Sequence, residues 1–161
     1  MKYLFLLFLI VPSGIKGQLQ SSLKHEIDQH QKGVGLWWAG HNGWIIKSNG
    51  LVISTDILLD YDKRINKPPI SEKELAQILD ISFVTHYHKD HFARSVSKVL
   101  IEESDCIFVI PESCLEIAKE LNIPAERIKL AVPRKEFKIL GVNVTPIRAI
   151  HGNANFAIYY K

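Results

Sequence analysis

A short apolar run leads directly into a group of histidines, and this junction constrains the fold more than any other stretch of the chain. Residues 81–85 read ISFVT and are nearly all apolar, as expected of a strand covered on both faces. His86, His88 and His91 follow in the sequence HYHKDH, with Asp90 beside the last of them. Loops at the carboxyl ends of such strands are where α/β folds bind ligands. The sequence therefore predicts a binding site at the end of this strand.

The spacing of the histidines indicates that the ligand is a metal ion. In an extended chain alternate side chains lie on the same side, so His86 and His88 face one way and Tyr87 the other. Two imidazoles held side by side can bind one divalent cation. Asp90 and His91 come where the chain turns into a helix, and from there they can reach a second cation. Exposed loop histidines without a common ligand are the alternative, and four ligating residues at one strand end argue against it.

Three strands joined by tight turns are predicted before this site. The runs VGLWWAG at 34–40, WIIKS at 44–48 and LVIST at 51–55 all read as strands. Asn49 and Gly50 separate the last two runs, and both residues tolerate the positive φ angles of a type I′ turn. This pair is a strong hairpin signal.

Helices and strands alternate in the middle of the chain. Residues 71–79 open with the capping box SEKE and continue with an apolar helical face. A helix is predicted at about 92–103 and another in ESCLEIAKELNI, on either side of the buried strand CIFVI at 106–110. The tail predicts two strands around Gly141 and a last one in NFAIYY. Such an order predicts an α+β protein with a mixed sheet and helices packed on it.

The histidine group resembles the His-x-His-x-Asp-His signature of the metallo-β-lactamase superfamily. Asp56, which ends LVISTD, is similar to the aspartate that closes an early strand in this family. His151, in AIHGN, is similar to its next metal histidine. The opening GHNGWIIKSNGLVISTDILL resembles a branch that includes the ascorbate-6-phosphate lactonase and related hydrolases. The similarity covers about residues 34 to 160 and implies an αββα sandwich.

The resemblance implies two metal ions in the complete fold. His86, His88 and His151 would hold the first ion, while Asp90 and His91 would contribute to the second and to catalysis. Zinc suits these ligands, and so do iron and manganese. A water between the ions would lose its proton near neutral pH, and the hydroxide would attack an ester, lactone, amide or phosphoester.

Other side chains have predicted roles around this centre. Asp56 is expected to orient the metal ligands through hydrogen bonds, without binding a metal itself. His41 is expected either to contact substrate at the rim of the metal cleft or to be a hydrogen-bonded turn residue. Trp37, Trp38 and Trp44 are predicted to be core and sheet-face residues rather than a platform for substrate.

The family pattern continues with a bridging aspartate and a final histidine. The residues after His151, GNANFAIYYK, include neither type. A truncated chain is the favoured interpretation, and a compact single-metal variant or a partner chain that supplies the missing half are the alternatives. Truncation would leave apolar strands such as AIYY with an exposed edge, which promotes association.

Residues 1–17 have the order of a secretory signal peptide, with a basic start, a short apolar run and a small residue at the cut. The apolar run is shorter than the roughly 20 residues of a spanning helix, so no stable membrane anchor is predicted. A buried N-terminal helix is the alternative. We therefore expect a secreted or periplasmic protein, with a polar segment at 18–32 and a metallo-β-lactamase-like domain at 33–161.

The predicted function is an exported metal-dependent hydrolase that acts on a small-molecule ester, lactone or phosphoester. A truncated, non-catalytic metal-binding remnant and a β-lactam hydrolase are the alternatives. Removal of the leader lowers the formal net charge from +3 to +1, and no basic stripe with interleaved aromatics remains, so a nucleic-acid partner is not expected. Cys106 and Cys114 would either pair in an oxidising compartment or remain buried thiols. The oligomeric state stays open.

Overall fold

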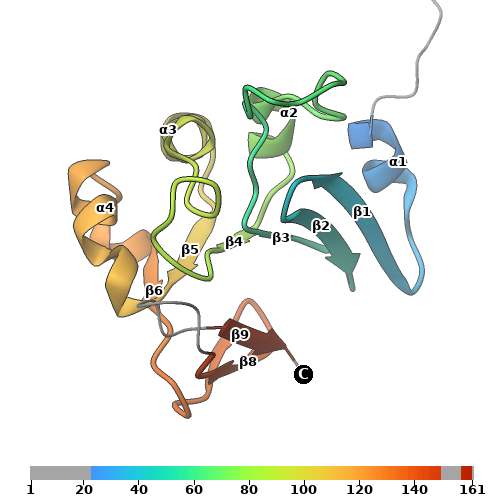
Figure 1. Ribbon diagram of the computed structural model, residues 1–161. Coiled ribbons are helices and arrows are strands. Elements are labelled where there is room, and N and C mark those ends of the chain that lie inside the picture. The colour runs from blue at the N-terminus through green and yellow to red at the C-terminus, as the bar shows by residue number, and fades with distance from the viewer. Residues whose placement is uncertain (1–22, 150–156, 161) are drawn as a thin grey trace, which may run out of the picture.

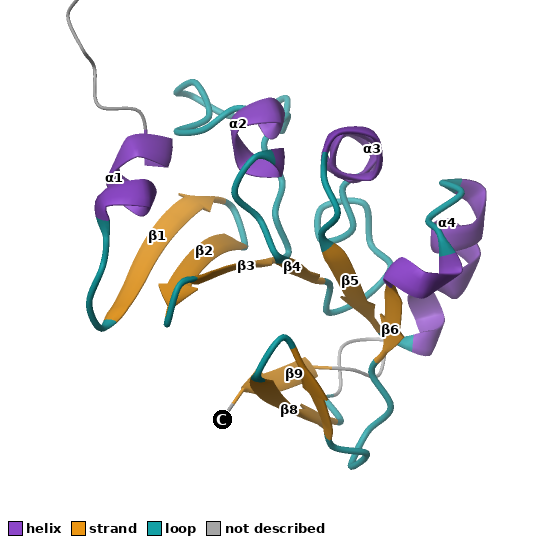
Figure 2. Ribbon diagram, turned by 180° about the vertical axis from the view of Figure 1, so that it is seen from behind, coloured by secondary structure: helices purple, strands orange, loops and turns teal. Residues whose placement is uncertain are grey.

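The computed structural model describes residues 23–149 and 157–160, and these form three layers (Figure 1). A six-stranded sheet lies in the middle, helices cover one of its faces, and a three-stranded sheet lies against the other (Figure 2). The predicted leader at 1–17 and the predicted ligand His151 lie outside the described residues. Within the described residues, no helix is long and apolar enough to cross a membrane.

The central sheet is mixed, as predicted. Its strands, in spatial as well as chain order, are β1 (Val34–Gly40), β2 (Gly43–Ser48), β3 (Leu51–Thr55), β4 (Ile81–Phe83), β5 (Ile107–Ile110) and β6 (Ile128–Leu130). Neighbours from β1 to β3 pair antiparallel, and those from β3 to β6 pair parallel. Two antiparallel steps make β1 run in the same direction as β3. The β1–β2 turn therefore lies at the same edge of the sheet as the carboxyl ends of β3, β4 and β5.

Local signals in the sequence account for several of these elements. Asn49 and Gly50 join β2 to β3 with φ angles of 50° and 84°, which confirms the predicted turn. The predicted capping box opens the second helix, because the Ser71 hydroxyl accepts from the Glu74 amide at 3.2 Å and the Glu74 carboxylate accepts from the Ser71 amide at 2.9 Å.

The main core lies between the central sheet and the helices. Its largest buried side chains include Ile45, Leu75, Leu100 and Phe108. The helices are α1 (Leu23–Gln29), α2 (Glu72–Ala76), α3 (Arg94–Glu103) and α4 (Leu115–Glu120), with short 3₁₀ turns η1 (Glu112–Cys114) and η2 (Ala125–Arg127).

A second, smaller core lies between the two sheets. The three-stranded sheet is antiparallel and consists of β7 (Phe137–Ile139), β8 (Val142–Ile147) and β9 (Ala157–Tyr160). Val144 of β8 is fully buried in one apolar cluster with Phe83 and Val109 of the central sheet. Three of the four layers of the predicted αββα sandwich are thus present in the described residues.

Some elements differ from the sequence-based prediction. Strand β4 ends at Phe83 rather than at residue 85, so the histidines follow a short loop instead of the strand itself. The helix predicted after Pro111 is divided into η1 and α4. Strand β6 was not predicted, because three residues with mixed burial, Ile128–Leu130, are too short to show alternation.

The three tryptophans divide between the core and a sheet face, as predicted. Trp37 packs on the main core, but Trp38 is 60% exposed and Trp44 is 43% exposed. These two residues are direct cross-strand partners on β1 and β2, and Leu36 on the same face of β1 is also exposed. They are sheet-face residues, as predicted, on a part of the sheet that no described element buries.

The cysteines follow one of the two predicted alternatives. Cys106 and Cys114 are both free and buried. Burial raises the pKa of the Cys114 thiol to about 12, so this side chain behaves as a small apolar group.

Candidate metal centre

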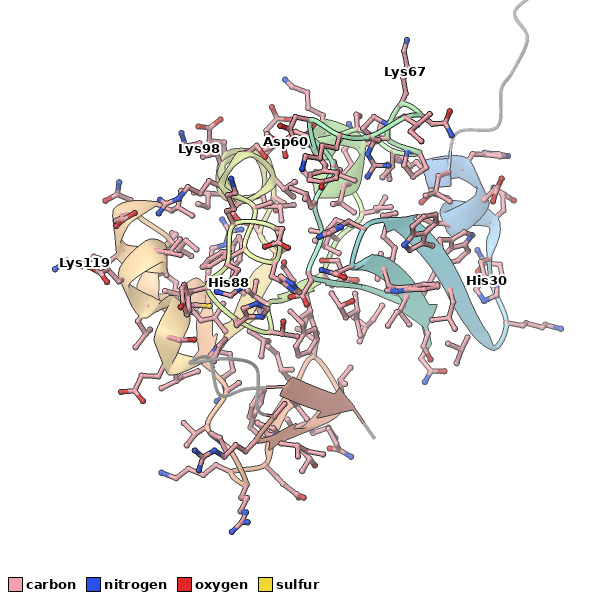
Figure 3. All side chains as sticks on the ribbon, in the orientation of Figure 1. His30, Asp60, Lys67, His88, Lys98 and Lys119 are labelled. Carbon is pink, nitrogen blue, oxygen red and sulfur yellow. The ribbon has the colours of Figure 1, made fainter. Side chains whose placement is uncertain are left out.

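The candidate site lies where three segments meet at the carboxyl edge of the parallel strands. These segments are the loop between β4 and α3, the end of β3, and the β1–β2 turn. His88 lies in the first segment, and Figure 3 shows it far from His30, which follows α1 at the other side of the molecule. Chain order alone separates the three segments by tens of residues, so the sheet topology is what brings them together.

His86 and His88 face each other through ring nitrogens. Nε2 of His86 lies 3.0 Å from Nδ1 of His88, and the ring centroids are 4.5 Å apart. His86 is buried, and its other nitrogen lies 3.0 Å from the Thr85 hydroxyl oxygen. Tyr87 between them is 40% exposed. The predicted alternation is therefore retained, even though the strand ends earlier.

Asp56 fastens the end of β3 to the loop after β4. Its backbone adopts a positive φ of 42°, and its side chain is buried. One carboxylate oxygen accepts from the Thr85 amide at 2.8 Å, while the other accepts from the Thr85 hydroxyl at 2.7 Å and lies 2.8 Å from Nδ1 of His91. With Nδ1–H donated to Asp56, Nε2 of His91 carries the lone pair that a cation requires. The contact with His91 is consistent with the predicted orienting role.

The β1–β2 turn contributes two further side chains. Nε2 of His41 lies 3.1 Å from a carboxylate oxygen of Asp90, and the Asn42 amide nitrogen lies 3.0 Å from Nε2 of His91. The His41 ring also stacks on Tyr61, with centroids 5.1 Å apart and planes inclined by 24°. His41 is thus a hydrogen-bonded turn residue, as one of the two expectations had it, and it lies beside the cluster; contact with substrate stays a prediction.

These contacts shift two ionisation equilibria. Burial disfavours the charged form of His91, but the hydrogen bond and charge of Asp56 outweigh it, so the pKa of His91 is raised. The hydrogen bond from His41 lowers the pKa of Asp90 and outweighs the opposing effect of its partial burial. Asp90 is therefore a carboxylate at neutral pH.

The donor set of the first predicted site fits a transition-metal ion. Among the described residues, no three histidine, cysteine or acidic side chains already surround one point, and the predicted third ligand, His151, lies outside them. The 3.0 Å between the facing nitrogens of His86 and His88 is close to the roughly 3.3 Å that separates two ligands of a tetrahedral zinc ion. The Thr85 hydroxyl at the remaining His86 nitrogen is the outer partner that metal-binding histidines usually have.

Two neighbours of the cluster were not predicted from the sequence. Thr85 contacts Asp56, His86 and His91 through one hydroxyl, and Asn42 contacts His91. Thr85 could have been inferred from its place between a strand and the histidines. Asn42 had no such signal, because its partner is 49 residues away.

Sequence comparisons found no match for the chain, neither among family models nor among curated proteins. Solved structures do match. Igni18, a metallo hydrolase from the archaeon Ignicoccus hospitalis KIN4/I, has a TM-score of 0.58 at 16% identity, over 78% of this chain and 53% of its own. CmlA, a diiron β-hydroxylase from Streptomyces venezuelae, has a TM-score of 0.59 at 14% identity, over 82% of this chain and 28% of its own. An isothiocyanate hydrolase from Delia radicum gut bacteria has a TM-score of 0.54 at 15% identity, over 73% of this chain and 49% of its own.

These likenesses concern the fold. The chain spans about half the length of two of these structures and less of the third. Over that part it has the metallo-β-lactamase fold, as the sequence resemblance predicts. The lactonase-like branch stays a prediction.

Proposed function

We propose that this chain is an exported metal-dependent hydrolase that acts on a small-molecule ester, lactone or phosphoester. The observation that carries the proposal is the facing pair His86 and His88, 3.0 Å apart at the ligand-binding edge of this fold. Hydrolases among the matched structures support the reaction class. A small-molecule substrate is the only partner proposed.

The side chains of the site have two proposed roles, since some bind the metal and others orient its ligands. His86, His88 and the predicted ligand His151 hold the first ion, and zinc is the proposed metal, with iron or manganese as alternatives. When bound, the ion supplies Lewis acidity, which activates water and polarises the substrate. In neutral His91, the 2.8 Å contact with Asp56 holds the proton on Nδ1, so that Nε2 is the nitrogen that can bind a cation. Asp90, with its lowered pKa, supplies a negative charge that favours a cation beside it.

A non-catalytic metal-binding protein is the second candidate. It is favoured by the hydrogen bonds from His41 and Asn42, which occupy Asp90 and His91 in the described structure. A protein that binds only at His86 and His88 would hold a cation without a second one to polarise the substrate.

Hydrolysis assays separate the two candidates. The zinc-, manganese- and iron-loaded chain is incubated with an aryl ester, a lactone, a phosphodiester and a β-lactam, and product is followed by absorbance or chromatography. We expect slow, metal-dependent turnover of an ester, lactone or phosphoester. Chelator-treated protein and His88→Ala serve as controls. Stoichiometric metal without turnover of any substrate would favour the non-catalytic candidate.

We also propose that residues 1–17 are removed on export. Their basic, apolar and small-residue order supports cleavage after Gly17. Mass spectrometry of the secreted or periplasmic product is expected to show a chain that begins near Gln18. An intact form that begins at Met1 and stays in the cytoplasm would rule this out.

A further inference from the structure

We propose that His41 is a metal ligand, and that it binds a second cation together with Asp90 and His91. The inference rests on the proposed metal centre and adds to it a ligand from the β1–β2 turn. Asp90 and His91 alone provide two donors. A third protein ligand completes the number with which catalytic zinc sites are built, and leaves one position open.

The donor atoms of these residues already lie close together. One oxygen of Asp90 is 3.1 Å from Nε2 of His41 and 3.7 Å from Nε2 of His91. Ligand atoms around one zinc ion are about 3.3 Å apart at tetrahedral angles. The distance from the carboxylate oxygen to each imidazole nitrogen is therefore close to the spacing of two ligand atoms on a shared cation.

Small side-chain rotations are needed to close the site. The His41 and His91 ring centroids are 6.5 Å apart, whereas two imidazoles on one tetrahedral zinc ion have centroids about 5 Å apart. The side chains of His41 and Asp90 are 31% and 39% exposed, so they can rotate without disturbing the core. The Asn42 amide, which lies against Nε2 of His91, must turn away toward solvent.

Contacts around the β1–β2 turn hold His41 beside Asp90 and His91. His41 has a positive φ of 50°, a conformation that is uncommon for residues other than glycine and that clusters at functional sites. Tyr61 stacks on the imidazole from one side. Arg64 fixes the base of the turn by donating to the carbonyl oxygens of Ala39 at 2.7 Å and Leu58 at 3.1 Å. A Cβ at Gly40 would overlap this guanidinium, so the turn and its clamp fit each other closely.

Titration of the purified full chain with Co²⁺ tests the inference, because bound Co²⁺ is counted by calorimetry and its ligand field is read in the visible spectrum. The parent is expected to bind one ion tightly and a second more weakly. His41→Gln can still donate a hydrogen bond to Asp90 but lacks the imidazole. We expect this variant to bind the second ion at least about tenfold more weakly, which is the lower end of what loss of an outer partner costs. Its affinity for the first ion should be unchanged.

Two variants guard against a merely structural effect. His41→Asn places a residue that tolerates positive φ at the turn, so it folds even if His41→Gln does not, and it should lose the second ion in the same way. Asn42→Ala removes the group that competes for His91, so binding of the second ion should stay equal or become tighter. If the substitutions merely damage the turn, His41→Gln, His41→Asn and Asn42→Ala should all bind the second ion more weakly. That outcome overturns the inference.

The remaining outcomes separate this inference from the proposed function. A parent that binds no Co²⁺ refutes both. A parent that binds one ion, lost in His88→Ala, with no second ion up to millimolar Co²⁺ refutes only the role of His41. The same holds if a second ion binds equally well to the parent and to His41→Gln.

Discussion

Alanine at position 88 is expected to abolish tight binding of the first metal ion. Nδ1 of His88 is one of the two nitrogens that face each other across 3.0 Å, and its removal leaves His86 without the neighbour that shares the cation. Loss of an outer partner costs 10- to 100-fold in affinity, so loss of a ligand atom should exceed roughly 100-fold. The parent should purify with about one tightly held ion per chain, and the variant with almost none.

Elemental analysis after dialysis provides the measurement. His25→Ala is the matched control, since it removes an exposed histidine from α1, which lies apart from the cluster (Figure 1). It should keep the full metal content. Equal metal content in the parent and His88→Ala, or no metal in either, would remove the basis of the proposed function.

The parts of the fold that the sequence predicts well are those set by neighbouring residues. The Asn49-Gly50 turn needs only two residues that accept positive φ, and the capping box at Ser71 needs only a partner three positions later. The facing of His86 and His88 likewise follows from alternation over three residues. In each case the interaction lies within a few positions of the chain, so a pattern in the sequence is enough to reveal it.

The parts that the sequence does not predict depend on strand order. His41 meets Asp90, and Asn42 meets His91, across 49 positions in each case. That proximity exists only because β1 runs parallel to β3 and β4, which no local pattern encodes. The exposure of Trp38 has the same origin, since an alternating strand shows which residues share a face but not what covers that face. The sequence pattern thus places His86 and His88 side by side, but it does not reveal which partners the β1–β2 turn meets.

Asparagine at position 56 is expected to weaken metal binding by about 10- to 100-fold, chiefly at His91. The Asp56 carboxylate accepts from three groups, namely the amide and hydroxyl of Thr85 and Nδ1–H of His91. An asparagine has the same shape but only one oxygen. If that oxygen remains on the Thr85 amide, the new NH₂ group faces His91 and favours the tautomer with the proton on Nε2. That nitrogen then has no lone pair for a cation.

The same substitution should also destabilise the fold. Asp56 joins β3 to the loop after β4 and is buried, so its loss leaves at least one partly buried donor without an acceptor. A cost of about 1–3 kcal/mol in the free energy of unfolding is expected for such a group. The raised pKa of His91 should fall at the same time, since burial would then act without the opposing carboxylate.

A second aspartate distinguishes the effect on the metal from the effect on stability. Asp80 accepts from the Val52 amide at 2.8 Å, at the opposite end of the same two strands, β3 and β4. Asp80→Asn should therefore lower stability while metal affinity stays at the parent value. Denaturant unfolding and Co²⁺ titration of both variants give the comparison. If Asp56→Asn lost stability but kept the parent's metal affinity, as expected of Asp80→Asn, Asp56 would be only a strand-end residue. If Asp56→Asn lowered the affinity for the metal and Asp80→Asn did not, Asp56 would be the group that keeps His91 in its ligand form.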